Sequence, residues 1–148
     1  MNAEIEKLVK QYHGIEPKTQ PMIDDLKSKN NELYRQSALK IVDYLDDIAT
    51  SLDGVQVSCS HEGFAFQFNG DVRPWKICFR GETVTRANAP SDTYMIPTLV
   101  LHWQDYKTHL LQAIQEQLQK LIAQTEQSQH YWIDRETKNN EYLNNFTI

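Results

Sequence analysis

The sequence predicts a single α+β domain over residues 1–148: a four-stranded antiparallel β-meander flanked by long N- and C-terminal helices packed on its aromatic face. Two observations predict this fold. Aromatic residues alternate with small or polar ones in FAFQF (64–68) and WKICFR (75–80), which is the period of a strand with one buried face. On both sides of these segments, apolar residues recur every three or four positions, which is the period of an amphipathic helix.

The N-terminal region predicts two helices. Residues 2–12 form a short amphipathic helix, which Gly14 and Pro17 end. A second helix begins near residues 19–21 and runs to about Leu52, where Asp53-Gly54 is a suitable stop. Its apolar stripe has gaps of three and four, like heptads, with two polar members: Ile23, Leu26, Asn30, Leu33, Ser37, Ile41, Leu45, Ile48 and Leu52.

Four short strands are expected at 55–59, 64–68, 75–80 and 82–86, joined by turns that contain glycine. Alternation assigns one apolar face, made of Val55, Val57, Cys59, Phe64, Phe66, Phe68, Trp75, Ile77, Phe79 and Val84. It assigns a polar face to Gln56, Ser58, Ser60, Gln67, Lys76, Arg80, Thr83 and Thr85. Residues 87–97 then read as a loop.

A third helix is expected from about residue 98 to 128, in a glutamine-rich sequence that keeps its helical period through Leu99, Trp103, Tyr106, Leu110, Ile114, Leu118 and Leu121. The sequence leaves the order of residues 130–148 open. The aromatic cluster Tyr131-Trp132-Ile133 has two interpretations: an anchor that folds the tail back over the sheet, or a contact for a partner protein.

The long helices exceed the sheet in length. A helix of about 30 residues spans roughly 45 Å, whereas a five-residue strand spans about 17 Å. We therefore expect the ends at 20–35 and 112–128 to project and to bury their apolar stripe, either antiparallel against each other or against a second copy. The candidate partner or dimer-interface residues are Leu26, Leu33, Leu118, Leu121, Tyr131 and Trp132.

Composition excludes some classes of function. The formal net charge of −5 disfavours a general nucleic-acid binder, and no apolar run reaches the roughly 18 residues of a membrane helix. The N-terminus does not resemble a signal peptide. Alternation puts Cys59 and Cys78 on opposite faces of the sheet, which argues against a disulfide and favours the cytoplasm.

The polar sheet face is the candidate ligand site. Gln67, Lys76, Arg80, Thr83 and Thr85 could hold a phosphate, a nucleotide or an acidic peptide. A metal is not expected, because two histidines seven positions apart on the third helix are about 10 Å apart along its axis. No cofactor and no catalytic residues are predicted, since no acid, base and nucleophile converge in the sequence.

These observations favour a small acidic cytoplasmic protein that acts by non-catalytic binding of another protein, as an accessory factor, inhibitor or chaperone, with a homodimer as one form. The alternative is a small-ligand, nucleotide or phosphate binder that uses the basic residues of the polar sheet face. An enzyme is the least favoured class.

Overall fold

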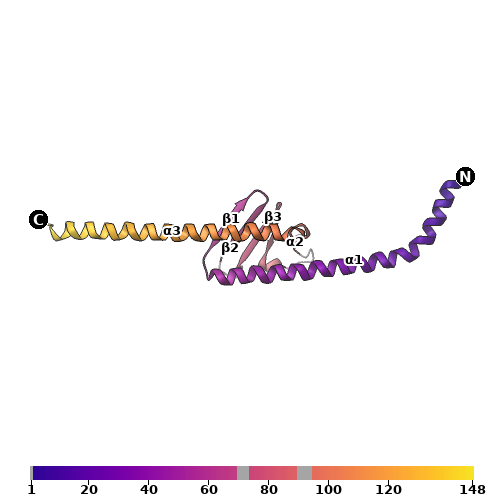
Figure 1. Cartoon of the computed structure of the whole chain (residues 1–148), viewed down its shortest axis with the longest axis horizontal. Coiled ribbons are helices and arrows are strands. Elements are labelled where there is room, and N and C mark those ends of the chain that lie inside the picture. Colours follow the sequence, from indigo (N-terminus) through magenta and orange to yellow (C-terminus); the bar gives the residue numbers. More distant parts are fainter. Residues whose placement is uncertain (1, 70–73, 90–94) are drawn as a thin grey trace.

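The computed structural model describes residues 2–69, 74–89 and 95–148. The elements, in chain order, are α1 (Ala3–Leu52), β1 (Val57–His61), β2 (Phe64–Phe68), β3 (Trp75–Phe79), β4 (Glu82–Thr85), the short 3-10 helix η1 (Arg86–Asn88), α2 (Pro97–Leu101) and α3 (Trp103–Asn144). A small sheet carries two much longer helices (Figure 1). The predicted α+β architecture is confirmed.

The sheet is an antiparallel meander in the order β1-β2-β3-β4. Phe66 lies opposite Ile77, and Phe68 lies opposite Trp75, so the alternating aromatic residues share one face as predicted. The glycine-containing turn expected between β2 and β3 lies partly outside the described residues. Arg80 and Gly81, with φ of 51° and 83°, make the tight β3–β4 turn that a twisted hairpin prefers.

The core lies between the aromatic face and the two long helices. From α1 it takes Ala38, Ile41 and Leu45, and from α3 it takes Leu110 and Ile114, all buried. These residues pack on the buried strand residues Val57, Phe66, Phe68, Trp75, Ile77 and Val84. Both long helices therefore cover the predicted face, except that β1 begins at Val57 and Val55, which was expected in the first strand, lies outside it and is exposed.

Helix α1 is one helix over 50 residues, so the prediction that Gly14 and Pro17 end a first helix is wrong. A proline removes one amide donor and bends a helix without necessarily ending it, and the N-terminal part of α1 bends in Figure 1. Asn2 caps the start by accepting hydrogen bonds from two backbone amides of the first turn. Asp53 and Gly54 end the helix in the left-handed conformation, as predicted.

The C-terminal half also differs from the prediction. The helix expected from residue 98 is divided at His102, and α3 then continues without a break to Asn144. Residues 130–144, whose order the sequence left open, are thus helical. Glutamine and the charged residues of this stretch are adequate helix formers, and their helix propensity extends α3 beyond the residues with regular apolar spacing.

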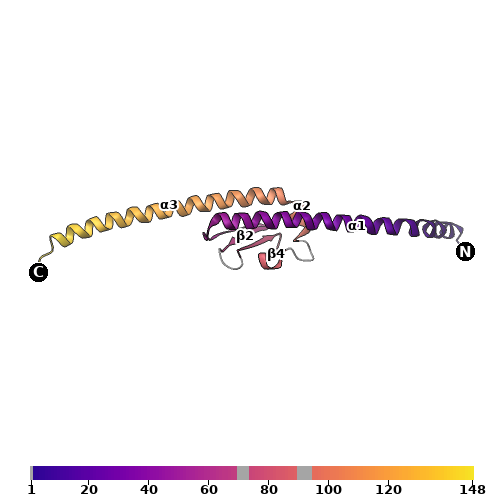
Figure 2. The same ribbon diagram turned by 90° about the horizontal axis from the view of Figure 1, so that it is seen from below.

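The two long helices cross the sheet in the same direction and extend beyond it at opposite ends (Figures 1 and 2). We call residues 3–35 the α1 arm, residues 119–144 the α3 arm, and the sheet with the helix segments that cover it the body. Leu26 and Leu33 on the α1 arm are 58% and 64% exposed. The expected antiparallel pairing of residues 20–35 with 112–128 inside one chain is therefore wrong, because the two arms point away from each other.

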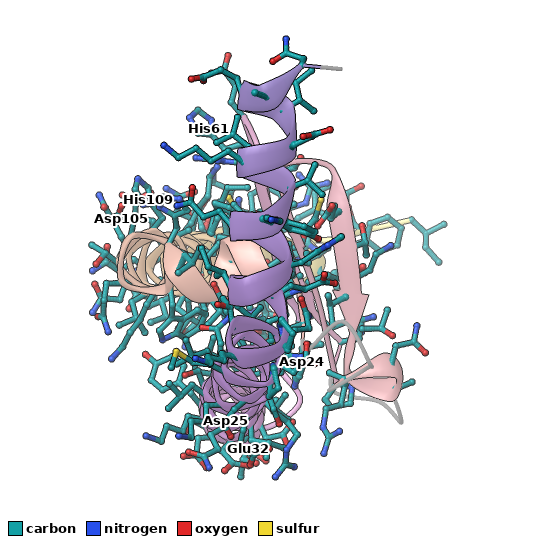
Figure 3. All side chains as sticks on the ribbon, turned by 90° about the vertical axis from the view of Figure 1, so that its right-hand side faces the viewer. Asp24, Asp25, Glu32, His61, Asp105 and His109 are labelled. Carbon is teal, nitrogen blue, oxygen red and sulfur yellow. The ribbon has the colours of Figure 1, made fainter. Side chains whose placement is uncertain are left out.

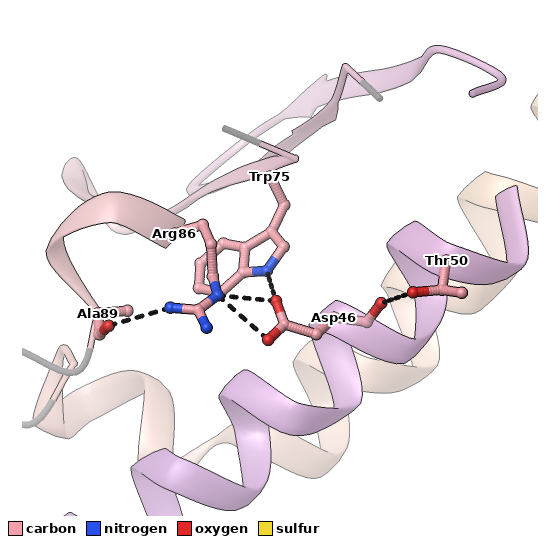
Figure 4. A network of polar contacts seen from close by, with 5 residues as sticks. All are labelled: Asp46, Thr50, Trp75, Arg86 and Ala89. Atoms are coloured by element: carbon pink, nitrogen blue, oxygen red, sulfur yellow. Dashed lines mark hydrogen bonds and ion pairs between the residues drawn. The ribbon is translucent and has the colours of Figure 1, made fainter. Parts of the chain in front are cut away.

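A polar network joins α1 to the edge of the sheet (Figure 4). The indole Nε1–H of buried Trp75 donates to Asp46 Oδ1 over 2.8 Å. Arg86 Nε lies 2.9 Å from the same oxygen and 3.1 Å from Oδ2. The ion pair is part-exposed and adds little by itself, so the bond to the buried indole is the larger contribution.

We expect Asp46→Ala to lower the free energy of unfolding by about 1–3 kcal/mol, because it leaves the Trp75 N–H buried without an acceptor. Asp46→Asn keeps an acceptor oxygen and removes the charge, so it should cost less. Urea unfolding followed by tryptophan fluorescence measures both. Equal losses for the two variants would show that the charge, and not the acceptor, stabilises this corner.

Candidate functional site

The polar face of the sheet gathers four of the five residues predicted to bind a ligand. Lys76 lies between Gln67 on β2 and Thr85 on β4, and Thr83 lies opposite Cys78. Arg80 is separated from them, because it lies in the β3–β4 turn and its guanidinium carbon is 5.1 Å from the centre of the Phe79 ring. The face therefore carries a single basic side chain, Lys76, among these five residues.

A surface hollow of about 390 Å³ lies beside this row. It is lined by Ser58, Cys59, Ser60, Ala65, Phe66, Gln67, Lys76 and Cys78. The backbone N–H of Ser58 donates to Gln117 Oε1 over 2.9 Å, so α3 fixes one edge of the hollow. One ammonium, one amide and two hydroxyls could hold a small polar ligand, but they do not form the bidentate cradle that a phosphate prefers.

A second hollow, of about 320 Å³, brings together residues that lie far apart in the sequence. It lies where the β1–β2 and β3–β4 turns meet the start of α3, and Figure 3 places His61, Asp105 and His109 on one side of the molecule. Its lining is His61, Glu62, Gly63, Phe64, Phe79, Arg80, His102, Asp105, Tyr106 and His109. No sequence signal linked His61, at the end of β1, to His102 and His109, because the packing of α3 across the turns sets their proximity.

The imidazoles of this second hollow are held against aromatic rings. His109 lies 6.0 Å from Phe64 and His102 lies 6.1 Å from Phe79, measured between ring centres. His109 Nδ1 is 2.7 Å from the carbonyl oxygen of Asp105, one turn earlier in α3. In the chain described here, with its gaps at 70–73 and 90–94, no three His, Cys, Asp or Glu residues are grouped to hold a metal ion.

Tyr106 is the buried polar residue behind this hollow. Its hydroxyl donates to the carbonyl oxygen of Ala65 over 2.7 Å. Burial raises the pKa of the Tyr106 phenol far above its usual value, and the nearby Cys78 and Cys59 thiols add to the rise. The phenol is therefore a neutral structural bridge between α3 and β2, and its environment is unsuited to a base.

The raised pKa predicts a loss of stability at alkaline pH. The unfolded chain releases this proton near pH 10 while the folded chain keeps it, so stability falls as the pH rises above about 10. Tyr106→Phe should lower the free energy of unfolding by about 0.5–1.5 kcal/mol at neutral pH. It should also reduce the further decrease in this free energy at alkaline pH. Urea unfolding at pH 7 to 11 measures it, with exposed Tyr131→Phe as the control. The same alkaline slope in Tyr106→Phe and the wild type would contradict the assignment.

The arms carry the predicted partner residues in exposed positions. Leu26, Leu33 and Leu121 are exposed, whereas Leu118 is partly buried against the edge of the core. Tyr131 and Trp132, at 57% and 63% exposure, contact each other edge to face with ring centres 5.3 Å apart. The interpretation that this cluster folds back over the sheet is therefore wrong.

The continuity of α1 creates a longer stripe than the sequence predicted. Because there is no break between residues 12 and 21, the apolar residues of both expected helices join on one face: Ile5, Leu8, Tyr12, Ile15, Met22, Leu26 and Leu33, all exposed. Their spacing of three, four or seven is that of a coiled-coil seam. On α3 the corresponding positions are Leu121, Thr125, Ser128, Trp132 and Tyr142, and a shallow groove of about 430 Å³ follows the first four.

Local ion pairs stabilise the arms as free helices. Lys29 pairs with Asp25 at 2.9 Å, and Lys138 pairs with Asp134 at 3.0 Å, both one helical turn apart. Arg35 pairs with Glu32 at 2.9 Å, and its hydrogen bonds to that carboxylate lower the pKa of Glu32. Exposed pairs of this kind add little to stability, so they leave the apolar stripe as the larger unused source of binding energy.

The chain was compared with protein-family models, with curated proteins and with solved structures, and none of them matches. Among the described residues, no helix combines the length and the apolar character needed to cross a membrane. The candidate sites therefore rest on the geometry of this molecule alone.

Proposed function

We propose that this protein is a non-catalytic protein-binding module whose binding elements are its two helical arms. The observation that carries the proposal is the exposure of large apolar side chains along both arms, on segments that contribute nothing to the core. On the α1 arm these side chains also have the spacing of a helix-packing stripe. An arm with such a stripe is the form that helix-to-helix recognition takes, since anchors at every third or fourth position enter a partner's groove.

The role within the class follows from the same features. The body fixes the arms in opposite directions, so one molecule can join two partner helices at some distance, as an accessory or chaperone-like factor does. The free Cys59 and Cys78 thiols support a reducing compartment, and we propose a cytoplasmic location on that ground.

Affinity capture with the full chain tests the module. The wild type should retain a defined protein that is lost from a Leu26→Asp, Leu33→Asp variant, because a carboxylate on the seam is buried without a partner on binding. A variant with Asn31→Asp and Ser28→Asp carries the same added charge on the same arm outside the seam, and it should retain the partner. Equal capture by both variants would contradict binding through the stripe.

The hollow beside Lys76 supports a second candidate function, the binding of a small polar or phosphorylated ligand on the sheet face. A thermal-shift panel of nucleotides and phosphates tests it. A member of the panel should raise the melting temperature of the wild type but not of Lys76→Glu, with Lys27→Glu on the α1 arm as the control. A flat panel for the wild type would remove this candidate.

A further inference from the structure

We propose that the partner of the arms is a second copy of this chain, in a two-fold antiparallel dimer where each α1 arm packs along the α3 arm of the other copy. This inference deepens the proposed function and depends on it. The strongest observation for it is the shape of one molecule: two parallel helices that cross one small body and project from its opposite ends (Figures 1 and 2).

In this dimer the two-fold axis is perpendicular to the long axis of the molecule, so the helices of the second copy run in the opposite direction to those of the first. At one end of the dimer, the α1 arm of the second copy then lies beside the α3 arm of the first copy. At the other end, the α1 arm of the first copy lies beside the α3 arm of the second. One symmetric contact thus covers all four arms, and the assembly closes at two copies. A parallel arrangement would pair like arms and would need a different surface at each end.

The seam has a defined register. Leu33 is the first large apolar residue beyond the body on the α1 arm, and Leu121 is the first on the α3 arm, so placing the bodies side by side sets these two opposite each other. Counting outward from this pair, towards the N-terminus on the α1 arm and towards the C-terminus on the α3 arm, two further exposed apolar pairs lie opposite each other: Met22 with Trp132, and Tyr12 with Tyr142. In this register the heptad positions of the two arms alternate as an antiparallel coiled coil requires.

The middle of the seam is polar. The same register places Lys29 opposite Thr125, Leu26 opposite Ser128, Thr19 opposite Arg135, and Ile15 opposite Asn139, so each of these levels has at least one polar member. Polar residues in an apolar seam lower its stability and penalise shifted registers, which suits a unique pairing. Charge does not oppose the contact, because residues 2–35 carry six basic and six acidic side chains and residues 119–148 carry three and four.

The contact is large enough for a stable dimer. The 26 residues of the α3 arm span about 39 Å, and a strip about 10 Å wide on each of four helix surfaces buries roughly 1,600 Å² in total. This is the usual size of a specific protein–protein interface. A stripe of isolated surface residues on a monomer would not reach it.

Cysteine cross-linking in a Cys59→Ser, Cys78→Ser background tests the arrangement. Leu33→Cys protein mixed with Leu121→Cys protein should form a disulfide-linked dimer under mild oxidation, and neither protein should do so alone, since like positions lie at opposite ends. Asn31→Cys with Ala123→Cys is the matched control at the same level but on the outer faces, and it should remain unlinked. Tyr12→Cys with Tyr142→Cys repeats the test near the tips.

Light scattering on the wild type completes the experiment, with an expected mass twice the 17.3 kDa of one chain. A monomeric mass would overturn the dimer, and so would linkage of Leu33→Cys protein with itself or linkage of the control pair. The proposed function fails in a different way. Capture of another protein through the stripe by a monomeric chain would retain the module and exclude only the second copy as its partner.

Discussion

Leu110→Ala is expected to lower the free energy of unfolding by about 2–5 kcal/mol, the loss typical of a cavity in a packed core. Leu110 is fully buried on α3, between Tyr106 and Ile114, where the helix meets the aromatic face of the sheet. The site has little freedom to collapse, because Tyr106 is fixed to β2 by its hydrogen bond and the strands are fixed by their register.

Leu101→Ala is the matched control, since it is the same chemical change on α2 at a residue 69% exposed. It should alter the free energy of unfolding by no more than about 0.5 kcal/mol. Urea unfolding of both variants at one protein concentration measures the difference. Equal small losses would mean that α3 does not pack on the sheet in the way described.

The second large effect is expected on association. Leu121→Asp combined with Trp132→Asp should weaken binding through the α3 arm by roughly 1,000-fold, because two anchor residues at about 2 kcal/mol each account for about 4 kcal/mol. Both side chains are exposed in the single chain. The circular dichroism spectrum and the melting temperature of the variant should therefore stay close to those of the wild type when both are compared in the same oligomeric state.

Ala123→Asp combined with His130→Asp is the control for this variant. It places the same number of carboxylates on the same arm, one helical face away from the seam. Sedimentation velocity over a concentration series measures both. If the control weakens association as much as the seam variant does, charge on the arm and not the seam governs binding.

The sheet could be predicted because its signals are local. Alternation from Phe64 to Phe68 and from Trp75 to Phe79 specifies one buried face, and the flanking helices carry apolar stripes suited to cover it. Arg80 was predicted to lie in a strand, because the alternation of apolar and polar residues gives no sign that the backbone turns into the left-handed conformation at this residue. The Arg80 amide donates a hydrogen bond to the carbonyl oxygen of Gly63 over 2.7 Å, which joins the two turns. Neither segment has a sequence pattern that predicts this contact.

The arms were less predictable. Gly14 and Pro17 are local stop signals and Pro21 is a local start signal, yet the surrounding residues sustain α1 through all three. The relative direction of α1 and α3 depends on how the chain returns from β4 to α2, and no residue pattern encodes that path. The second hollow shows the same limit, since His61 and His109 come together only through the packing of α3 across the turns.

Small-angle X-ray scattering in solution tests the central claim most directly, because it reports mass and length together. The arms span about 50 Å and 39 Å beyond the body, so a side-by-side antiparallel dimer should have twice the mass of one chain and a maximum dimension of roughly 110 Å, close to that of a single chain. A compact particle of one chain, with the arms folded back on the body, would contradict the account.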